Sequence, residues 1–368
     1  MKNKITIVGI NFWPEDTAIG LYTYQLANFY KEQGLEVNVI TGFPYYPAWK
    51  INSEYKSKKK FHEESINGIK IYRYKQYVPK NPIFIKRILH LLDFTLGSFI
   101  NLFKIKKTDV VLCVVPFIGC VFIGKFLAKL KGAKLWVHIQ DFEFDAVSDS
   151  NLVEEKTDKN FIFRILFYFE SKLLNSADLL STISSSMVKK LTGKTKSEIE
   201  KKLLPNWVDP NFILPEEHKK HSYLKSDKFK ILYSGNIGEK QDWDFFIKFA
   251  KELEKEKDVQ IIVVGNGSKR YWLEEKLLDL ENIWFYSPVA YSELSDLLCS
   301  ADLHILFQKV NVIDTVMPSK ILAMMASEKP SLITGSLKSE VAKVLIESKG
   351  GKFFETNNTQ DVLQYVYE

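Results

Sequence analysis

The chain has 368 residues, more than one hydrophobic core usually supports, so we expect two domains. Hydrophobic residues make up 46% and charged residues 26%, a balance that is typical of a globular protein and excludes a disordered one. The net charge of +6 is modest, and three cysteines without a CxxC spacing argue against a disulfide framework or a structural zinc site and favour a reducing cytoplasm.

The first predicted element is a buried strand in "MKNKITIVGINFWP". Its apolar part is too short for a secretion signal. A helix is predicted over residues 21–33, and Gly20 stands at its start. Because glycine lacks a side chain, Gly20 would let a ligand approach the turn closely. A simple helix start is the alternative interpretation.

The segment from Lys50 to Lys107 is strongly basic, with 14 Lys and Arg against four Asp and Glu. Such a segment indicates an anionic partner. Residues 81–107 contain an apolar run that is too short to span a bilayer but fits an amphipathic helix on anionic lipid. One predicted helical face holds Ile88, Leu91, Leu92, Thr95, Leu96 and Phe99. A helix that packs on the core is equally compatible, and a nucleic acid is disfavoured because no binding motif is present.

A strand predicted within "KLWVHIQDFEFDAV" ends in a histidine and is followed by carboxylates. His138, Asp141 and Glu143 are candidates for proton transfer or for binding sugar hydroxyls, because they follow the carboxyl end of a buried strand. For His138 alone, a hydrogen-bonded core histidine is the usual alternative.

Short apolar runs alternate with helical patterns along the chain, which predicts parallel βαβ units. The rhythm breaks at "LPNWVDPNFILP", and a charged stretch follows. We therefore predict an α/β protein with two Rossmann-like doubly wound domains, residues 1–207 and 208–368, facing each other across a cleft. Ligands bind beyond the carboxyl ends of the strands in such sheets.

The loop "YSGNIGEKQDW" joins a predicted strand to a predicted helix over residues 242–256. Gly235 permits an unusual backbone conformation, the helix start offers free N–H groups, and Lys240 adds a cation. Together with the neighbouring Asn236 and Gln241, these features suit a phosphate group. An ordinary turn with a solvated lysine is the alternative. The acidic pair of "DWD" is best explained by capping, so no metal is predicted.

Two further loops have similar features. Gly265 and Gly267 in "VVGNGSKR" follow a strand and would allow a ligand to approach the backbone. Ser319 and Lys320 in "DTVMPSKILAMMA" stand at a helix start, where a cation opposes the helix dipole unless an anion binds there. Two loops with a lysine beside a helix start would form a diphosphate clamp.

Taken together and in order, several motifs resemble the family 4 glycosyltransferases, in particular those of bacterial capsule, colanic-acid and O-antigen clusters. The motifs are "INFWPEDTAIGLYTYQLA", "TGFPYYPAW", "VHIQDFEFDA", "STIS", "PNWVD", "YSGNIGEKQ", "VVGNG" and "VMPSKILAMMASEKPSLIT". The resemblance implies the GT-B fold, with the acceptor in the N-terminal domain and a nucleotide-sugar donor in the C-terminal domain. It also implies transfer with retention of configuration and without a metal or cofactor.

The resemblance assigns roles to individual residues. His138 matches an active-site histidine near the transferred sugar, and Lys240 matches a lysine that binds the diphosphate. Gly20 would lie against donor phosphate and acceptor. The remaining donor-binding candidates are Asn236, Gln241, Gly265, Gly267, Asp314, Ser319 and Lys320, and Asp141 and Glu143 are candidates on the acceptor or sugar side.

The sequence departs from the family at three places. Asn236 replaces a common arginine, while Thr315 and Ala323 replace a pair of glutamates, with Asp314 as a partial substitute for the first. We also expect most of the final helix that crosses back to the N-terminal domain to be missing.

The expected function is that of a retaining glycosyltransferase. It would move a sugar, fucosyl or aminosugar among the candidates, from a GDP- or UDP-linked donor to a lipid-linked acceptor in capsule, exopolysaccharide or O-antigen synthesis. We expect it in the cytoplasm, attached peripherally to the inner face of the membrane through residues 50–107, with no nucleic acid partner. A non-catalytic nucleotide-sugar-binding partner protein and a nucleotide-sugar 2-epimerase are the alternatives.

Overall fold

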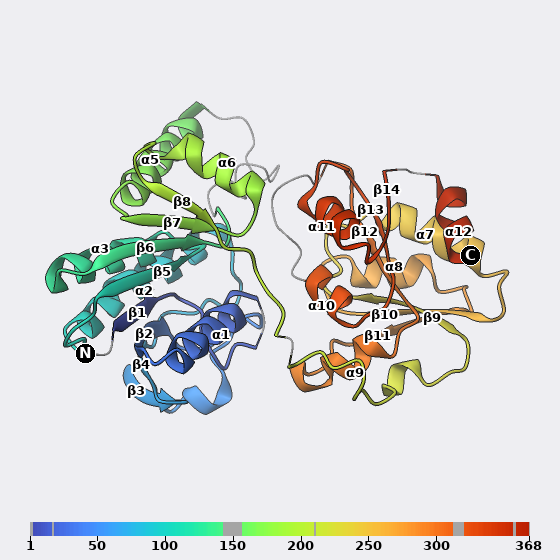
Figure 1. The fold of residues 1–368 in the computed structure, drawn as a ribbon, viewed down its shortest axis with the longest axis horizontal. Coiled ribbons are helices and arrows are strands. Elements are labelled where there is room, and N and C mark those ends of the chain that lie inside the picture. Colours follow the sequence, from blue (N-terminus) through green and yellow to red (C-terminus); the bar gives the residue numbers. More distant parts are fainter. Residues whose placement is uncertain are drawn as a thin grey trace. The chain divides into compact units, whose positions relative to one another are not determined.

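The structure, a computed structural model, describes residues 3–16, 18–142, 157–209, 211–311, 320–355 and 358–367. By its internal contacts the chain divides into two compact units, Met1–Pro205 and Asn206–Glu368. Each unit has one sheet covered by helices (Figure 1).

The described strands of the first unit form one eight-stranded sheet in the order β3-β4-β2-β1-β5-β6-β7-β8. Only the pairing of β3 with β4 is antiparallel. The strands are β1 (Lys4–Val8), β2 (Glu36–Gly42), β3 (Phe61–Ile66), β4 (Ile69–Tyr74), β5 (Val110–Val115), β6 (Lys134–Ile139), β7 (Leu179–Thr182) and β8 (Glu200–Leu203). Strands β1 and β5 are apolar and buried along most of their length, as expected of a parallel sheet covered on both faces.

The helices of the first unit lie between these strands in the chain. They are α1 (Ala18–Glu32), α2 (Phe84–Leu102), α3 (Gly119–Lys131), α5 (Thr157–Leu174) and α6 (Ser185–Lys194), with a short 3-10 helix, η1 (Ser53–Tyr55). Their ends follow local rules. The Ser184 side chain accepts a hydrogen bond from Met187 N (3.2 Å) and caps α6, and α3 ends at Gly132, whose φ of 65° is left-handed.

The described strands of the second unit form one parallel sheet in the order β11-β10-β9-β12-β13-β14. The strands are β9 (Phe229–Ser234), β10 (Val259–Val264), β11 (Ile283–Tyr286), β12 (Leu303–Phe307), β13 (Ser331–Thr334) and β14 (Gly351–Phe354). The helices are α7 (Trp243–Leu253), α8 (Arg270–Lys276), α9 (Leu294–Cys299), α10 (Lys320–Ala326), α11 (Glu340–Ser348) and α12 (Thr359–Tyr367), with the 3-10 helices η2 (Ser222–Leu224) and η3 (Tyr291–Glu293).

Helix α7 shows how the second unit builds its core. Asp242 accepts a hydrogen bond from Phe245 N (3.0 Å), which confirms that the "DWD" sequence caps this helix. Phe249 packs against Phe307 of β12, with ring centroids 5.1 Å apart.

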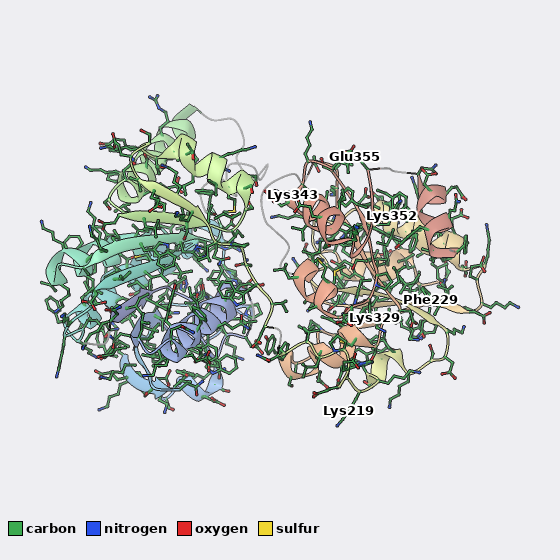
Figure 2. The ribbon with its side chains drawn as sticks, in the orientation of Figure 1. Lys219, Phe229, Lys329, Lys343, Lys352 and Glu355 are labelled. Carbon is green, nitrogen blue, oxygen red and sulfur yellow. The ribbon has the colours of Figure 1, made fainter. Side chains whose placement is uncertain are left out.

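Exposed charged side chains on this unit come from separate segments of the chain, for example Lys219, Lys343 and Lys352 (Figure 2).

Both sheets contain a point where the strand order reverses. In the first unit the chain moves outward from β1 to β2 and later from β5 to β6, so the reversal lies between β1 and β5. In the second unit it lies between β9 and β12. Ligands of doubly wound sheets bind beyond the carboxyl ends of the strands at such a point. The loops that follow β9 and β12 are therefore the natural place for a ligand of the second unit.

The predicted alternation of strands and helices is confirmed, because the short apolar runs of the sequence, such as "KITIVGI", "DVVLCVV" and "VQIIVVGNG", each contain a strand. Strands β3 and β8 were not predicted. Strand β3 has the sequence "FHEESI" and β8 has "EKKL", and both lie at the edges of the sheet, where one side of a strand faces solvent and polar residues are tolerated.

Candidate functional site

The loops after β9 and β10 lie in direct contact. Ile237 N donates a hydrogen bond to Asn266 O (2.9 Å). A Cβ atom at Gly265 would stand 1.9 Å from Gly235 O, and one at Gly267 would stand 2.2 Å from Ile237 O. Side chains at these two positions would force the loops apart. In this structure, therefore, Gly265 and Gly267 allow the backbone of the loop after β9 to approach closely.

Lys320, the first residue of α10, reaches across to the loop after β9. Its Nζ donates to the Tyr233 hydroxyl (3.1 Å) and lies 4.4 Å from the centre of the same ring. A Cβ atom at Gly235 would stand 3.3 Å from this Nζ, and Gly235 has a φ of 143°, which favours glycine. The Tyr233 hydroxyl in turn donates to Asn236 O (2.7 Å). Lys320 and the glycine loop thus form one cluster.

The charge of Lys320 is not compensated by any carboxylate within 4 Å among the described residues. Burial lowers the pKa of Lys320 from 10.5 to about 7, because the surroundings disfavour the charged form. An anion beside the ammonium group would restore the charged form. Lys320 at the reversal point between β9 and β12 is therefore suited to bind an anionic ligand.

The loop that carries Lys240 is attached to the end of β12. Gln241 and Gln308 form an isolated antiparallel bridge, and Lys309 N donates to Lys240 O (3.2 Å). Gln241 also accepts a hydrogen bond from Gly238 N through its side chain (3.3 Å). The Lys240 side chain is exposed. The backbone of this loop is thus fixed at both ends of its turn, while its lysine extends from it.

His138 lies in the first unit at the end of β6 and is 1% exposed. Its Nδ1 lies 2.9 Å from Ser181 Oγ, and its Nε2 lies 2.9 Å from Gln140 Nε2. Burial lowers the pKa of His138 to about 4. The imidazole is therefore neutral at physiological pH, with a hydrogen-bond partner at each nitrogen, as in the core-histidine alternative.

A second buried histidine shares this property and permits a prediction about acid stability. Burial lowers the pKa of His304, on β12, to about 4. The pKa of histidine in an unfolded chain is about 6.5, so the unfolded state binds more protons between about pH 6.5 and pH 4. We expect the free energy of unfolding to fall as the pH is lowered through this range. Urea unfolding of His304→Asn should show a shallower decline than the wild type, and an identical decline would contradict this.

Gly20 lies in the first turn of α1, and the space beside its Cα atom is filled by Glu15 of the same unit. A Cβ atom there would stand 2.8 Å from Glu15 Cβ and 2.9 Å from Glu15 O. Asp141 directs one carboxylate oxygen to its own loop, where Phe142 N donates to Asp141 Oδ1 (2.8 Å). Of the other predicted site residues, Glu143, Asp314 and Ser319 lie outside the described residues.

Sequence reasoning missed two residues that organise these clusters. Tyr233 was interpreted as part of an apolar strand, yet its hydroxyl links Lys320 to the glycine loop. Glu15 was not singled out, although it is a buried carboxylate, 4% exposed, beside Gly20. In the sequence, Tyr233 is a polar residue near the end of a strand and Glu15 is a polar residue before a helix start. Residues of both kinds are common, so neither position predicts a special role.

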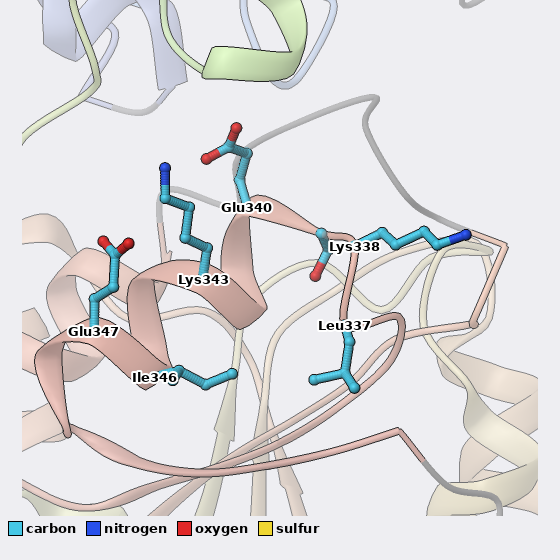
Figure 3. A pocket seen from close by; sticks show the side chains of 7 residues that line it. Leu337, Lys338, Glu340, Lys343, Ile346 and Glu347 are labelled. Carbon is cyan, nitrogen blue, oxygen red and sulfur yellow. The ribbon is translucent and has the colours of Figure 1, made fainter.

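A pocket of about 390 Å³ lies beside α11, away from the cluster around Lys320. Figure 3 shows Leu337 and Ile346 on one side, with Glu340 and Lys343 directed away from them. Two lysines and two glutamates line the pocket, so it has no net positive charge for a phosphate. We do not assign the donor to it.

Comparison with known proteins identifies the second unit and then the whole chain. Residues 228–368 match the family model described as "Glycosyl transferases group 1". The chain is 34% identical over 354 residues to the "Putative colanic acid biosynthesis glycosyl transferase WcaI" of Escherichia coli (strain K12), covering 93% of this chain and 85% of that protein.

Solved structures resemble the fold of the chain at low sequence identity. Sucrose-phosphate synthase from Thermosynechococcus elongatus has a TM-score of 0.72 at 12% identity, covering 100% of this chain and 89% of that one. WaaG, a glycosyltransferase involved in lipopolysaccharide biosynthesis, has a TM-score of 0.65 at 14% identity (98% and 89% covered). HepE of Anabaena, in complex with UDP and glucose, has a TM-score of 0.65 at 13% identity (98% and 88% covered). With two mainly parallel sheets of the GT-B type and a relative that is 34% identical over 93% of the chain, the chain belongs to the group 1, or family 4, glycosyltransferases.

Proposed function

We propose that the protein transfers one sugar from a nucleotide diphosphate sugar to a lipid-linked acceptor, with retention of configuration, in the synthesis of an exopolysaccharide of the colanic-acid type. The observation that supports this most is the Lys320 amine, which lies beside Gly235 at the reversal point of the second sheet and has no carboxylate within 4 Å among the described residues. The name of the Escherichia coli relative points to the same class of polysaccharide.

In this proposal the donor diphosphate binds between Lys320 and Lys240. Negative charge develops on the diphosphate as the bond to the sugar breaks, and cations fixed beside it stabilise the transition state. Asn236 and Gln241 line the same loop, and Gly265 and Gly267 hold the adjoining loop close to it. Asp314 and Ser319 would complete the donor site.

The acceptor hydroxyl attacks from the side that the leaving group vacates, so that configuration is retained. The departing phosphate takes the proton of that hydroxyl. His138 is neutral and buried, and both of its nitrogens have partners, so in this proposal it fixes the end of β6 near the transferred sugar and does not act as the base. Asp141 and Glu143 would contact sugar hydroxyls.

The lipid-linked acceptor is supported by the outer face of α2. Besides Arg87, the exposed side chains of this helix are apolar, and they lie along one stripe: Ile85, Ile88, Leu89, Leu92, Leu96 and Ile100, followed by Phe103. Its buried face carries the polar residues His90, Ser98 and Asn101 beside the apolar Phe94 and Leu102. None of the described helices has the length and apolar character needed to cross a bilayer. We infer that this face lies on the membrane.

Basic side chains lie beside this helix. Lys60 lies 5.4 Å from the centre of the Tyr74 ring, and the Tyr74 hydroxyl donates to Asp93 on α2 (3.0 Å). Lys104, just after the helix, pairs with Glu63 on β3 (2.8 Å). An apolar face with flanking cations fits an anionic lipid surface at the cytoplasmic side of the membrane.

The donor is tested with a panel of UDP-, GDP- and dTDP-sugars. HepE is in complex with UDP and glucose, so UDP-glucose comes first in the panel, followed by GDP-fucose and UDP-linked aminosugars. We expect one nucleotide to raise the melting temperature and its sugar to be released slowly to water. A shift without release of the sugar would favour a non-catalytic binding protein, and interconversion of the donor to its 2-epimer would favour an epimerase.

Lys240→Ala should lower kcat by about tenfold and leave the melting temperature unchanged. Lys240 is exposed, so water and salt weaken its interaction with the diphosphate more than that of a buried cation. Steady-state kinetics with the donor found in the panel would measure the change. Lys248→Ala, on the exposed side of α7, is the matched control, and unchanged turnover in Lys240→Ala would count against the donor site.

A further inference from the structure

The carboxylate of Glu15 joins two loops of the first unit. Its Oε1 accepts hydrogen bonds from Tyr45 N (2.7 Å) and Tyr46 N (2.8 Å), and its Oε2 accepts one from Asn11 Nδ2 (2.9 Å). Glu15 belongs to the loop between β1 and α1, while Tyr45 and Tyr46 follow β2. The ends of two adjacent strands are therefore held together by one side chain.

Because Glu15 is buried, loss of its hydrogen bonds to the Tyr45 and Tyr46 amides would destabilise the structure. Glu15 is 4% exposed, and burial raises the pKa of its carboxyl group, against which the hydrogen bonds from Tyr45 N and Tyr46 N act in the opposite direction. Truncating the side chain would leave two backbone N–H groups without their acceptor. Gly20 supports the arrangement, because any Cβ atom there would collide with Glu15.

Arg73 fastens the same two loops at a second point. Its guanidinium donates to Gly42 O (3.1 Å) at the end of β2 and to Trp13 O in the loop after β1, and it pairs with Glu64. Arg73 is 0% exposed. The buried side chains of Glu15 and Arg73 thus hold the two loops together, whereas loops of this kind are usually mobile.

The loop after β2 also rests on the inner side of α2. The rings of Tyr45 and His90 lie 4.6 Å apart, and the rings of Trp49 and His90 lie 5.5 Å apart. His90 is buried on the side of α2 opposite to its exposed apolar stripe. A lipid held at that stripe would carry its saccharide to the loops at the strand ends. Tyr46 is 43% exposed there and can offer its ring to a sugar.

We propose that Glu15 is a positioning residue for the acceptor, which fixes the loop after β2 so that the exposed Tyr46 ring contacts the acceptor saccharide. This proposal rests on the function proposed above. Glu15 does not touch the reacting atoms. Its role is to place the acceptor hydroxyl, and a misplacement of about 1 Å lowers the rate of a reaction by about 100-fold.

The test compares Glu15→Ala with Glu15→Gln in the full chain. Glutamine keeps an oxygen for both N–H groups, and Asn11 can turn its amide to match. We expect Glu15→Ala to lower kcat/KM for a synthetic polyprenyl diphosphate monosaccharide by about 100-fold, with release of the donor sugar to water unchanged. Glu15→Gln should retain most of the transfer. Tyr46→Ala should raise the acceptor KM, and the exposed Glu54→Ala is the control.

Amide hydrogen exchange provides a readout that does not depend on activity. The Tyr45 and Tyr46 amides should be protected in the wild type and in Glu15→Gln, and should exchange at least about tenfold faster in Glu15→Ala. Normal transfer to the acceptor by Glu15→Ala would overturn the positioning role. An equal decrease in the rate of transfer and in the rate of sugar release to water in Glu15→Ala would overturn it as well. If the wild type transfers no sugar, the proposed function fails, while unchanged amide protection in Glu15→Ala overturns the link between the loops.

Discussion

Lys320→Met is expected to lower kcat/KM for the sugar donor by about 10²–10³-fold, the loss typical of removing one preorganised group that stabilises developing charge. The same variant should be as stable as the wild type at pH 7, or more stable. Methionine has a similar length and fills the space over the Tyr233 ring, whereas the surroundings of Lys320 disfavour its charged form and no carboxylate of the described residues lies within 4 Å. Loss of function with retained stability would mark Lys320 as part of the binding machinery.

The pH dependence gives this prediction a second readout. Because the pKa of Lys320 is lowered to about 7, the free protein loses this proton as the pH rises above 7, and affinity for an anionic donor should fall in that range. The unfolded chain keeps the proton to about pH 10.4, so the wild type should gain stability between about pH 7 and pH 10. Lys320→Met should lack both dependences. The exposed Lys338→Met is the control, and full activity in Lys320→Met would refute the donor site.

The double substitution Leu92→Glu with Leu96→Glu should weaken binding to vesicles of phosphatidylglycerol and phosphatidylethanolamine by at least about 100-fold. Leu92 is 51% exposed and Leu96 is 71% exposed on α2. Burying a leucine side chain contributes about 1.5–3 kcal/mol, and a carboxylate both removes this contribution and repels anionic lipid. Vesicle sedimentation measures the change. Release of the donor sugar to water should remain normal, because the second unit is unchanged.

A matched control separates this surface from apolar exposure in general. Leu278, in the second unit, is 80% exposed, and Leu278→Glu should bind vesicles as the wild type does. High salt should weaken binding of the wild type, since Lys60 and its neighbours contribute through charge. Equal vesicle binding by the double variant and the wild type would show that α2 is not the membrane contact.

The sequence was sufficient to predict the fold class and the family, because both are carried by local patterns. Runs such as "DVVLCVV" have the β-branched residues of a buried parallel strand. Helix α7 can be predicted from its capping residue Asp242 and from its apolar face. The motifs that resemble the family follow one another in the right order, and the relationship to WcaI confirms that resemblance.

The arrangement of the site was less accessible to sequence reasoning, because it depends on contacts between distant residues. Tyr233 and Lys320 are 87 positions apart, and the closeness of their side chains follows only from the adjacency of β9 and β12. Gly265 and Gly267 were singled out as places where a ligand could approach the backbone, and that role stays a prediction. Their partner in the structure is the loop after β9, a contact that no local pattern encodes.

The orientation of α2 illustrates the same limit. The sequence indicated an amphipathic helix and assigned Thr95 and Leu96 to one face. In the structure Thr95 is 8% exposed and Leu96 is 71% exposed, so this face is divided between the core and the surface. Periodicity identifies an apolar stripe, but which side of a helix meets the sheet is decided by the partner it packs on. Here polar residues such as Ser98 face inward together with the apolar Phe94 and Leu102, while the outward stripe is apolar.

The bridge between Gln241 and Gln308 ties the segment that carries Lys240 to the segment that ends β12. Segments joined in this way open and close together, as one cooperative element. A graft that changes the backbone of only one of them would disturb their common hydrogen bonds. We therefore expect a graft to keep the stability of the second unit only when both segments are exchanged together.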